Sequence, residues 1–329
     1  MMRIRLWAWV FLGIVAALVH SLPAAAAATG RRPQAVGPSF TQTRITIDRN
    51  RRIDLRGKSW ILSNSRTPTP TRSSNCRIGT DRINRYPLIV EGPGRARIYG
   101  GSIIGRVPQN SPWGASYCNS AAIEIRTNGA TLDSFYARNV WDGVRIAGPQ
   151  GSSFRLSNIW ISGARDDCVE NDQLLSLELR NSLLESCFMG ISVEPNCGKS
   201  ACRFDDSRAT LDINNSLIGL KAATVDPVSG ENIMGAVFFK TSIWSPRINI
   251  RNSVLALEAI LPRDRARLMT FKNKIGRCEN NLLLLTGDDP VDELDFPPSC
   301  FTVYRGEEAR QKWDELRARW VAANARRFH

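Results

Sequence analysis

The sequence is almost without histidine. Its two histidines are His20, near the start, and His329, the last residue. No pair of cysteines has the Cys-x-x-Cys spacing that is typical of zinc sites. The sequence therefore gives no support to a zinc centre, and we expect no resident cofactor.

Long apolar runs are also scarce. One such run, from Leu6 to Val19, follows Arg3 and Arg5 and precedes the alanine-rich stretch 24–28. It is shorter than the roughly 20 residues that a membrane-spanning helix needs. This order predicts a signal peptide over residues 1–28 and a secreted or periplasmic protein, with no integral membrane segment after its removal. An uncleaved membrane anchor is the alternative.

Acidic residues are fewer than basic ones. The chain has 44 lysine and arginine residues against 31 aspartate and glutamate residues. This excess favours a polyanionic partner, which would be an acidic polysaccharide, a phosphorylated lipid headgroup or a nucleic acid. The alternative is that the positive charge only keeps the protein soluble and forms structural ion pairs. For an exported chain we expect an acidic polysaccharide and no nucleic acid. The sequence does not indicate the oligomeric state.

Cysteines are present in an even number, which predicts disulfides in an exported chain. The eight are Cys76, Cys118, Cys168, Cys187, Cys197, Cys202, Cys278 and Cys300. We expect sequence neighbours to pair. Cys197–Cys202 would then close a tight loop, and Cys278–Cys300 would fix the C-terminal section.

The middle of the chain lacks helical periodicity and consists of short β-rich runs, one of which covers residues 154–161. The runs repeat with offsets of 25 and 22 residues, which brings Val144, Val169 and Ile191 into one column. Periods of this length indicate a solenoid. We therefore predict an all-β fold, a single-stranded right-handed parallel β-helix over residues 29–305. A β-sandwich is the competing fold.

Asparagines form a second repeating track. They are Asn158, Asn181, Asn215 and Asn252, each followed by isoleucine or serine. Asparagines at one corner of successive coils would stack and bond along the axis.

The C-terminus changes character. Trp313, Leu316, Trp320 and Ala323 have helical spacing. We predict a capping helix over residues 306–329 that covers an open end of the solenoid. A helix for a membrane surface or a partner protein is the alternative.

Three aspartates lie in the aligned coils and are the candidate catalytic residues. Asp142 aligns with Asp167 one coil away, and Asp166 precedes it. Since neighbouring strands lie about 4.8 Å apart, the three carboxyls should cluster and raise one another's pKa. Glycosidases need such acid and base groups. The alternative is turn chemistry, because Asp142-Gly143 suits a tight corner.

The order of short motifs resembles that of the polygalacturonase family of glycoside hydrolases, within the pectin lyase-like superfamily of right-handed parallel β-helices. The matching segments are Asn139–Asp142, Arg165–Val169, Phe188–Ser192 and Phe238–Lys240. Met189 and Phe238 stand where that family has histidine and arginine. The resemblance implies an inverting hydrolase in which Asp166 is the general acid, Asp142 and Asp167 activate water, and Lys240 contacts a substrate carboxylate.

A charged column accompanies these aspartates. It contains Glu124, Arg145, Glu170 and Ser192, and it is either a surface salt ladder or part of a sugar groove. Expected substrate-binding residues are Arg145, Glu170, Lys240 and Trp141, with Trp160 as a further stacking residue.

Two other functions stay open. One is a polysaccharide lyase with Arg145 or Lys240 as base, in which Asp142, Asp167, Glu170 and Asp172 would hold calcium. The other is a non-catalytic β-helix that binds a glycan or serves as a scaffold.

Overall fold

The structure is a computed structural model that describes residues 43–62, 86–107, 109, 120–195, 208–221, 237–258, 271–287 and 299–328. The predicted signal peptide lies outside these residues, as do Cys76, Cys118, Cys197 and Cys202.

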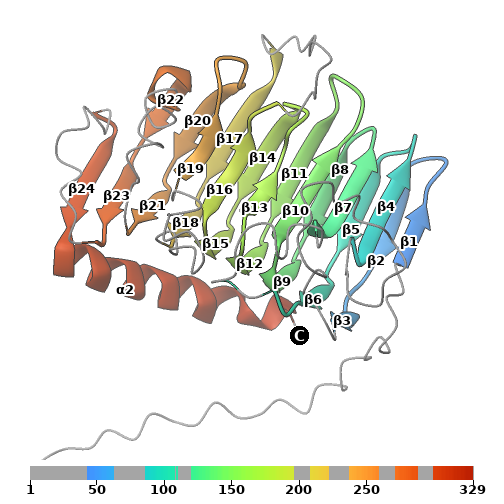
Figure 1. Cartoon of the computed structure of the whole chain (residues 1–329), viewed down its shortest axis with the longest axis horizontal. Coiled ribbons are helices and arrows are strands. Elements are labelled where there is room, and N and C mark those ends of the chain that lie inside the picture. The colour runs from blue at the N-terminus through green and yellow to red at the C-terminus, as the bar shows by residue number, and fades with distance from the viewer. Residues whose placement is uncertain are drawn as a thin grey trace, which may run out of the picture. The chain divides into compact units, whose positions relative to one another are not determined.

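The described strands form three parallel sheets, and up to β21 each coil contributes one strand to each sheet (Figure 1). Sheet A contains β1 (Thr43–Thr46), β4 (Leu88–Gly92), β7 (Ala121–Thr127), β10 (Asp142–Ala147), β13 (Asp167–Glu170), β16 (Met189–Val193) and β19 (Val237–Thr241). Sheet B contains β2 (Arg51–Asp54), β5 (Ala96–Tyr99), β8 (Ala130–Asp133), β11 (Ser153–Ser157), β14 (Ser176–Arg180), β17 (Thr210–Asn214), β20 (Arg247–Arg251) and β22 (Ile275–Glu279). Sheet C contains β3 (Ser59–Ile61), β6 (Ser102–Ile104), β9 (Tyr136–Val140), β12 (Trp160–Ala164), β15 (Leu183–Cys187), β18 (Leu217–Leu220), β21 (Val254–Leu257), β23 (Asn281–Leu285) and β24 (Phe301–Arg305).

The register confirms the parallel β-helix. Val144 pairs with Val169, and Val169 pairs with Ile191, as the repeat predicts. These side chains point into one continuous apolar core, where each coil buries its inner face against the next. A sandwich would consist of antiparallel sheets, so this alternative is wrong.

The corner between sheets B and C explains the asparagine track. Asn158, Asn181, Asn215 and Asn252 all have positive φ, between 44° and 51°, a conformation that asparagine tolerates better than most residues. Asn181 Nδ2 donates to Asn158 Oδ1 at 2.6 Å, one coil away. The same corner divides the predicted run 154–161 into β11 and β12.

Serines beside these asparagines continue the ladder inside the corner. The backbone N–H groups of Ile159, Ser182 and Ser216 each donate to a serine hydroxyl of the next coil, at 3.2 Å. The last rung, from Ser253 N–H, ends on Asn281 Oδ1 at 3.0 Å. Each rung satisfies a buried donor, which stabilises the stacked coils.

Two disulfides lie within the described residues. Cys278–Cys300 confirms the predicted bridge in the C-terminal section. Cys168–Cys187 joins β13 to β15 across the core, and it too links sequence neighbours.

The C-terminal helix α2 (Gly306–Asn324) continues into the short 3-10 helix η5 (Ala325–Phe328). Its apolar side packs on sheet C, where Trp313 and Leu316 contact a cluster with Val254 and Leu284. The predicted helix is therefore confirmed, and it lies along the side of sheet C rather than over an end of the coils (Figure 1).

Polar contacts also fasten this helix. Arg317 Nη2 donates to Glu185 Oε1 of β15 at 3.1 Å. An aromatic contact adds to this, because the ring centroids of Phe328 and Trp160 lie 5.8 Å apart.

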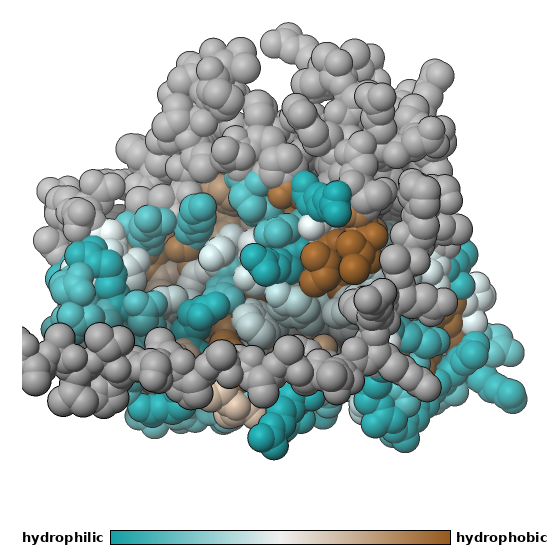
Figure 2. All heavy atoms as spheres, turned by 90° about the horizontal axis from the view of Figure 1, so that it is seen from below, coloured by the Kyte–Doolittle hydropathy of each residue, from teal (hydrophilic) through white to brown (hydrophobic). Residues whose placement is uncertain are grey.

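Seen from this side, the described surface is mostly hydrophilic (Figure 2). Within the part of the chain that the structure describes, no helix combines the length and apolar character needed to span a bilayer.

Candidate functional site

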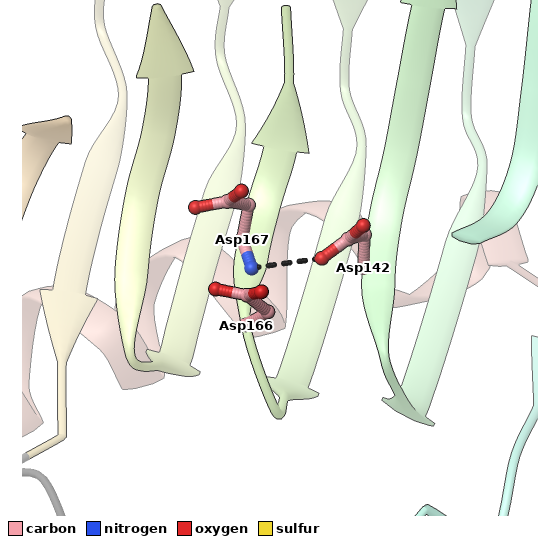
Figure 3. A group of neighbouring side chains, drawn as sticks. All are labelled: Asp142, Asp166 and Asp167. Atoms are coloured by element: carbon pink, nitrogen blue, oxygen red, sulfur yellow. Dashed lines mark hydrogen bonds between the residues drawn. The ribbon is translucent and has the colours of Figure 1, made fainter. Parts of the chain in front are cut away.

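The three candidate aspartates meet at the start of two adjacent strands of sheet A (Figure 3). Asp142 begins β10, Asp166 precedes β13, and Asp167 begins β13. One carboxylate oxygen from each lies within 4.8 Å of the others. Asp142 Oδ1 accepts the backbone N–H of Asp167 at 3.0 Å. We call Asp142, Asp166 and Asp167 the aspartate triad.

The triad lies outside the main core, on the far side of sheet A from the stacked apolar residues. Its register partners Ala121 and Met189 belong to separate small clusters. Even so, the aspartates are only 3–7 % exposed, and Asp166 is the most exposed of them. Oδ1 of Asp167 has no hydrogen-bond partner within the described part of the chain. The triad is therefore a concentration of buried, incompletely satisfied charge.

Burial and mutual repulsion decide the protonation of the triad. Burial raises the pKa of Asp142 well above its ordinary value, and the negative charges of Glu170, Asp166 and Asp167 raise it further. Burial and Asp166 likewise raise the pKa of Asp167, whereas the ammonium group of Lys240 lowers it. Like charges this close do not all ionise together at neutral pH. The raised pKa values of Asp142 and Asp167 therefore favour a protonated carboxyl in the triad.

The predicted charged column lies three residues further along the same strands. Arg145 pairs in register with Glu124 and with Glu170, and Ser192 pairs with Lys240. Arg145 Nη1 lies 2.9 Å from Glu170 Oε2. The column thus contains a salt bridge, as one of the two interpretations requires, and it borders the triad.

Glu170 links the charged column to the triad, because its negative charge raises the pKa of Asp142. Burial raises the pKa of Glu170 itself to about 7, Arg145 opposes that rise, and Asp172 adds to it. Ser192 Oγ donates to Asp172 Oδ1 at 2.8 Å. These contacts hold both acids in place and leave them less suited to coordinate a cation.

Lys240 lies next to the triad, which the sequence predicts only through the family resemblance. The charge of Asp167 raises the pKa of Lys240, and Asp166 and Asp172 add to that effect against the cost of burial. Burial disfavours the charge on Arg145, yet Glu170 and other neighbours outweigh it and raise its pKa. Both groups are therefore held as cations beside the acids.

Trp141 does not take the stacking position expected of it. It is only 4 % exposed, and the guanidinium of Arg165 lies 5.9 Å from its ring centre. Trp160 belongs to the aromatic contact with Phe328. Among the described residues, the large aromatic that stands exposed is Trp244, which is 51 % exposed in the turn after β19. Its exposure, rather than any motif, distinguishes it.

The aspartate triad is the one group of acids, among the described residues, whose oxygens lie close enough to share a metal ion. Calcium takes six to eight oxygen ligands. Two of the residues expected to hold calcium in a lyase, however, are engaged by other groups. Glu170 pairs with Arg145, and Asp172 accepts a hydrogen bond from Ser192. The arrangement therefore fits acid–base chemistry better than calcium coordination.

No protein-family profile, curated protein or solved structure matches the chain.

Proposed function

We propose that this protein binds an acidic polysaccharide along the outer face of sheet A and hydrolyses its glycosidic bonds. The observation that supports this most is the buried aspartate triad, in which three carboxyl oxygens lie within 4.8 Å of one another next to two cations. Hydrolysis of a glycosidic bond needs a carboxylic acid and a carboxylate at one place.

The roles follow from exposure and charge. Asp166, the most exposed of the three, protonates the glycosidic oxygen as the bond to the anomeric carbon breaks. Asp167 takes a proton from the water that adds to this carbon, and Lys240 partly offsets the rise in its pKa that burial and Asp166 cause. Asp142 is less available as a base, since burial and the charges of Glu170, Asp166 and Asp167 raise its pKa and favour its protonated form; it positions Asp167 through the hydrogen bond to its backbone.

The neighbouring cations give the site its preference for acidic sugars. Lys240 and Arg145 are partly exposed and positively charged. A sugar carboxylate at the strands' outer face would meet both, and Arg145 would bind it in a bidentate manner. Trp244 offers an exposed ring for stacking at the end of the same sheet.

Hydrolysis is favoured over elimination by the same electrostatics. A lyase would need Arg145 or Lys240 as a neutral base at the moment of proton abstraction. The surrounding acids raise the pKa of both groups, so neither is a good base at neutral pH.

The carboxyl spacing of the triad is shorter than that of inverting glycosidases. The nearest oxygens of the triad lie within 4.8 Å, closer than the roughly 6.5–9.5 Å that separates the carboxyls of inverting glycosidases. The anomeric form of the first product is therefore an outcome to be measured.

We also propose that the protein is secreted or periplasmic. The two disulfides are typical of proteins in oxidising compartments, and the predicted signal peptide agrees with them.

The test is an activity assay on uronate-containing and bacterial polysaccharides with the protein lacking residues 1–28. New reducing ends without the absorbance of unsaturated uronates are expected. Asp166→Asn should reduce the rate by roughly 10²–10⁴-fold, the usual contribution of a general acid. Asp212→Asn, on the outer face of sheet B, is the matched control and should retain activity.

Three results would overturn the proposal. Unsaturated products would indicate a lyase, and equal loss of activity in Asp212→Asn would indicate damage to the fold. Polysaccharide binding without any new reducing ends would indicate a non-catalytic glycan-binding protein.

A further inference from the structure

Sheet B carries a feature that the proposed hydrolysis does not use. A groove of about 590 Å³ lies on its outer face, across the N-terminal coils. Arginines from three of its strands or the residues beside them line it. We call this feature the arginine groove, and its arginines are Arg51, Arg52, Arg95, Arg97 and Arg155.

Among the described residues, little negative charge compensates the arginines of this groove. Glu178 is the single acid in its lining, and it pairs with Arg155 at 2.6 Å. Asp54, at the end of β2, is engaged by Arg56, with Nε at 2.9 Å. Within the described residues, no salt bridge engages Arg51, Arg95 or Arg97. Such a cluster repels itself unless an anion occupies it.

The groove is also organised locally. Arg52 and Arg97 are register partners on β2 and β5, and the guanidinium of Arg52 lies 4.7 Å above the ring of Tyr99. Asn50 Oδ1 accepts the backbone N–H of Arg95 at 3.0 Å. A Cβ atom at Gly129 would lie 3.2 Å from Arg95 Nη2, so this glycine leaves room for that side chain.

We infer that the arginine groove is a second binding site for a linear acidic polysaccharide, separate from the aspartate triad. Parallel strands lie about 4.8 Å apart, so Arg52 and Arg97 repeat one positive charge along the solenoid axis. Successive anionic groups of a polymer with one such group on each sugar would pair with these successive charges. The guanidinium group of arginine binds carboxylate or sulfate in a bidentate manner.

The same surface fits other polyanions less well. Single-stranded nucleic acid binds through exposed aromatic platforms, but Arg52 lies over the Tyr99 ring and Phe154 is buried. Membrane-binding faces combine basic residues with exposed apolar ones. The large apolar residues that are exposed among those described, Ile243 and Trp244, do not line the groove.

The choice of a polysaccharide rests on the proposed function, whereas the anion site itself does not. One polysaccharide molecule, or two neighbouring ones, would bind to sheets A and B together. The polysaccharide would then stay on the protein while the triad cleaves its glycosidic bonds. The groove would then raise the local concentration of substrate at the site.

The experiment measures the affinity of the full mature chain for polygalacturonate and for dextran sulfate by calorimetry, at two salt concentrations. The test variant is Arg52→Ala/Arg97→Ala, and Arg247→Ala, on β20 of the same sheet, is the matched control. We expect affinity to fall by at least roughly tenfold in the test variant, as the loss of charged hydrogen bonds implies, with a weaker salt dependence. The control should bind like the wild type.

Equal affinity of the test variant and the control for both polymers would overturn the inference. So would tighter binding of phosphatidylglycerol vesicles or a single-stranded oligonucleotide than of either glycan. Binding that depends on Arg52 and Arg97, without any hydrolysis, would keep the inference while the proposed function fails. Hydrolysis that requires Asp166, with binding independent of both arginines, would show the reverse.

Discussion

Two stacks of polar side chains run along the same coils and differ in how their groups are satisfied. At the corner of sheets B and C, Asn158, Asn181 and the neighbouring serines donate and accept along the axis. On sheet A, Asp142 and Asp167 place like charges one coil apart, and Asp167 Oδ1 has no partner in the described region.

This difference shows what each stack contributes. A fully bonded polar ladder stabilises a solenoid and fixes its register. Buried carboxyls that repel one another destabilise it instead. Ionisable groups that lower stability and have strongly shifted pKa values are typical of functional sites. The triad, and not the asparagine corner, is therefore the candidate for chemistry.

The largest effect expected outside the aspartate triad concerns Lys240, which stabilises the ionised form of Asp167. Lys240→Gln should reduce hydrolysis by roughly 100-fold, within the range of acid–base contributions. Because the pKa of Asp167 would rise, the acidic limb of the pH–kcat profile should move to higher pH. Lys240→Arg should restore most of the rate. A lower rate with an unchanged pH profile would remove Lys240 from this role.

The asparagine corner should respond in stability instead of activity. Asn181→Ala loses the bonds to Asn158 and Asn324 and places alanine at a φ of 44°. The expected loss is about 2 kcal/mol of unfolding free energy, measured by urea denaturation. Asn181→Gly tolerates the backbone and should lose about half as much. Wild-type stability of the alanine variant would contradict the structural role of this ladder.

The smallest effect is a change in how stability depends on pH. Glu170 has a pKa raised from 4.5 to about 7 in the folded protein, so the folded state holds a proton that the unfolded state has lost. Stability should therefore fall as pH rises from about 4.5 to about 7. In Glu170→Gln this fall should be shallower, as seen in melting temperatures across that range. Parallel pH curves for the two proteins would contradict the raised pKa.

The fold was predictable where the repeat is short. The offsets of 25 and 22 residues align Val144, Val169 and Ile191, and the structure pairs these residues. The same register brings Asp142 beside Asp167 and Arg145 beside Glu170. The asparagine track also followed from local sequence, because each coil turns the same corner.

Other features depended on contacts that no local pattern encodes. Lys240 lies in register with Ser192 although 48 residues separate them, so the period could not reveal it. Arg52 and Arg97 are 45 residues apart for the same reason. Trp141 is buried beneath Arg165, a packing detail that hydropathy does not predict.

The most direct test of the account is the protonation state of the aspartate triad. Carbon-13 NMR of labelled aspartate carboxyls can follow each group through a pH titration of the folded protein. We predict that at least one of the three carboxyls stays protonated at pH 7. Full ionisation of Asp142, Asp166 and Asp167 at that pH would contradict the raised pKa values and, with them, the acid–base role of the site.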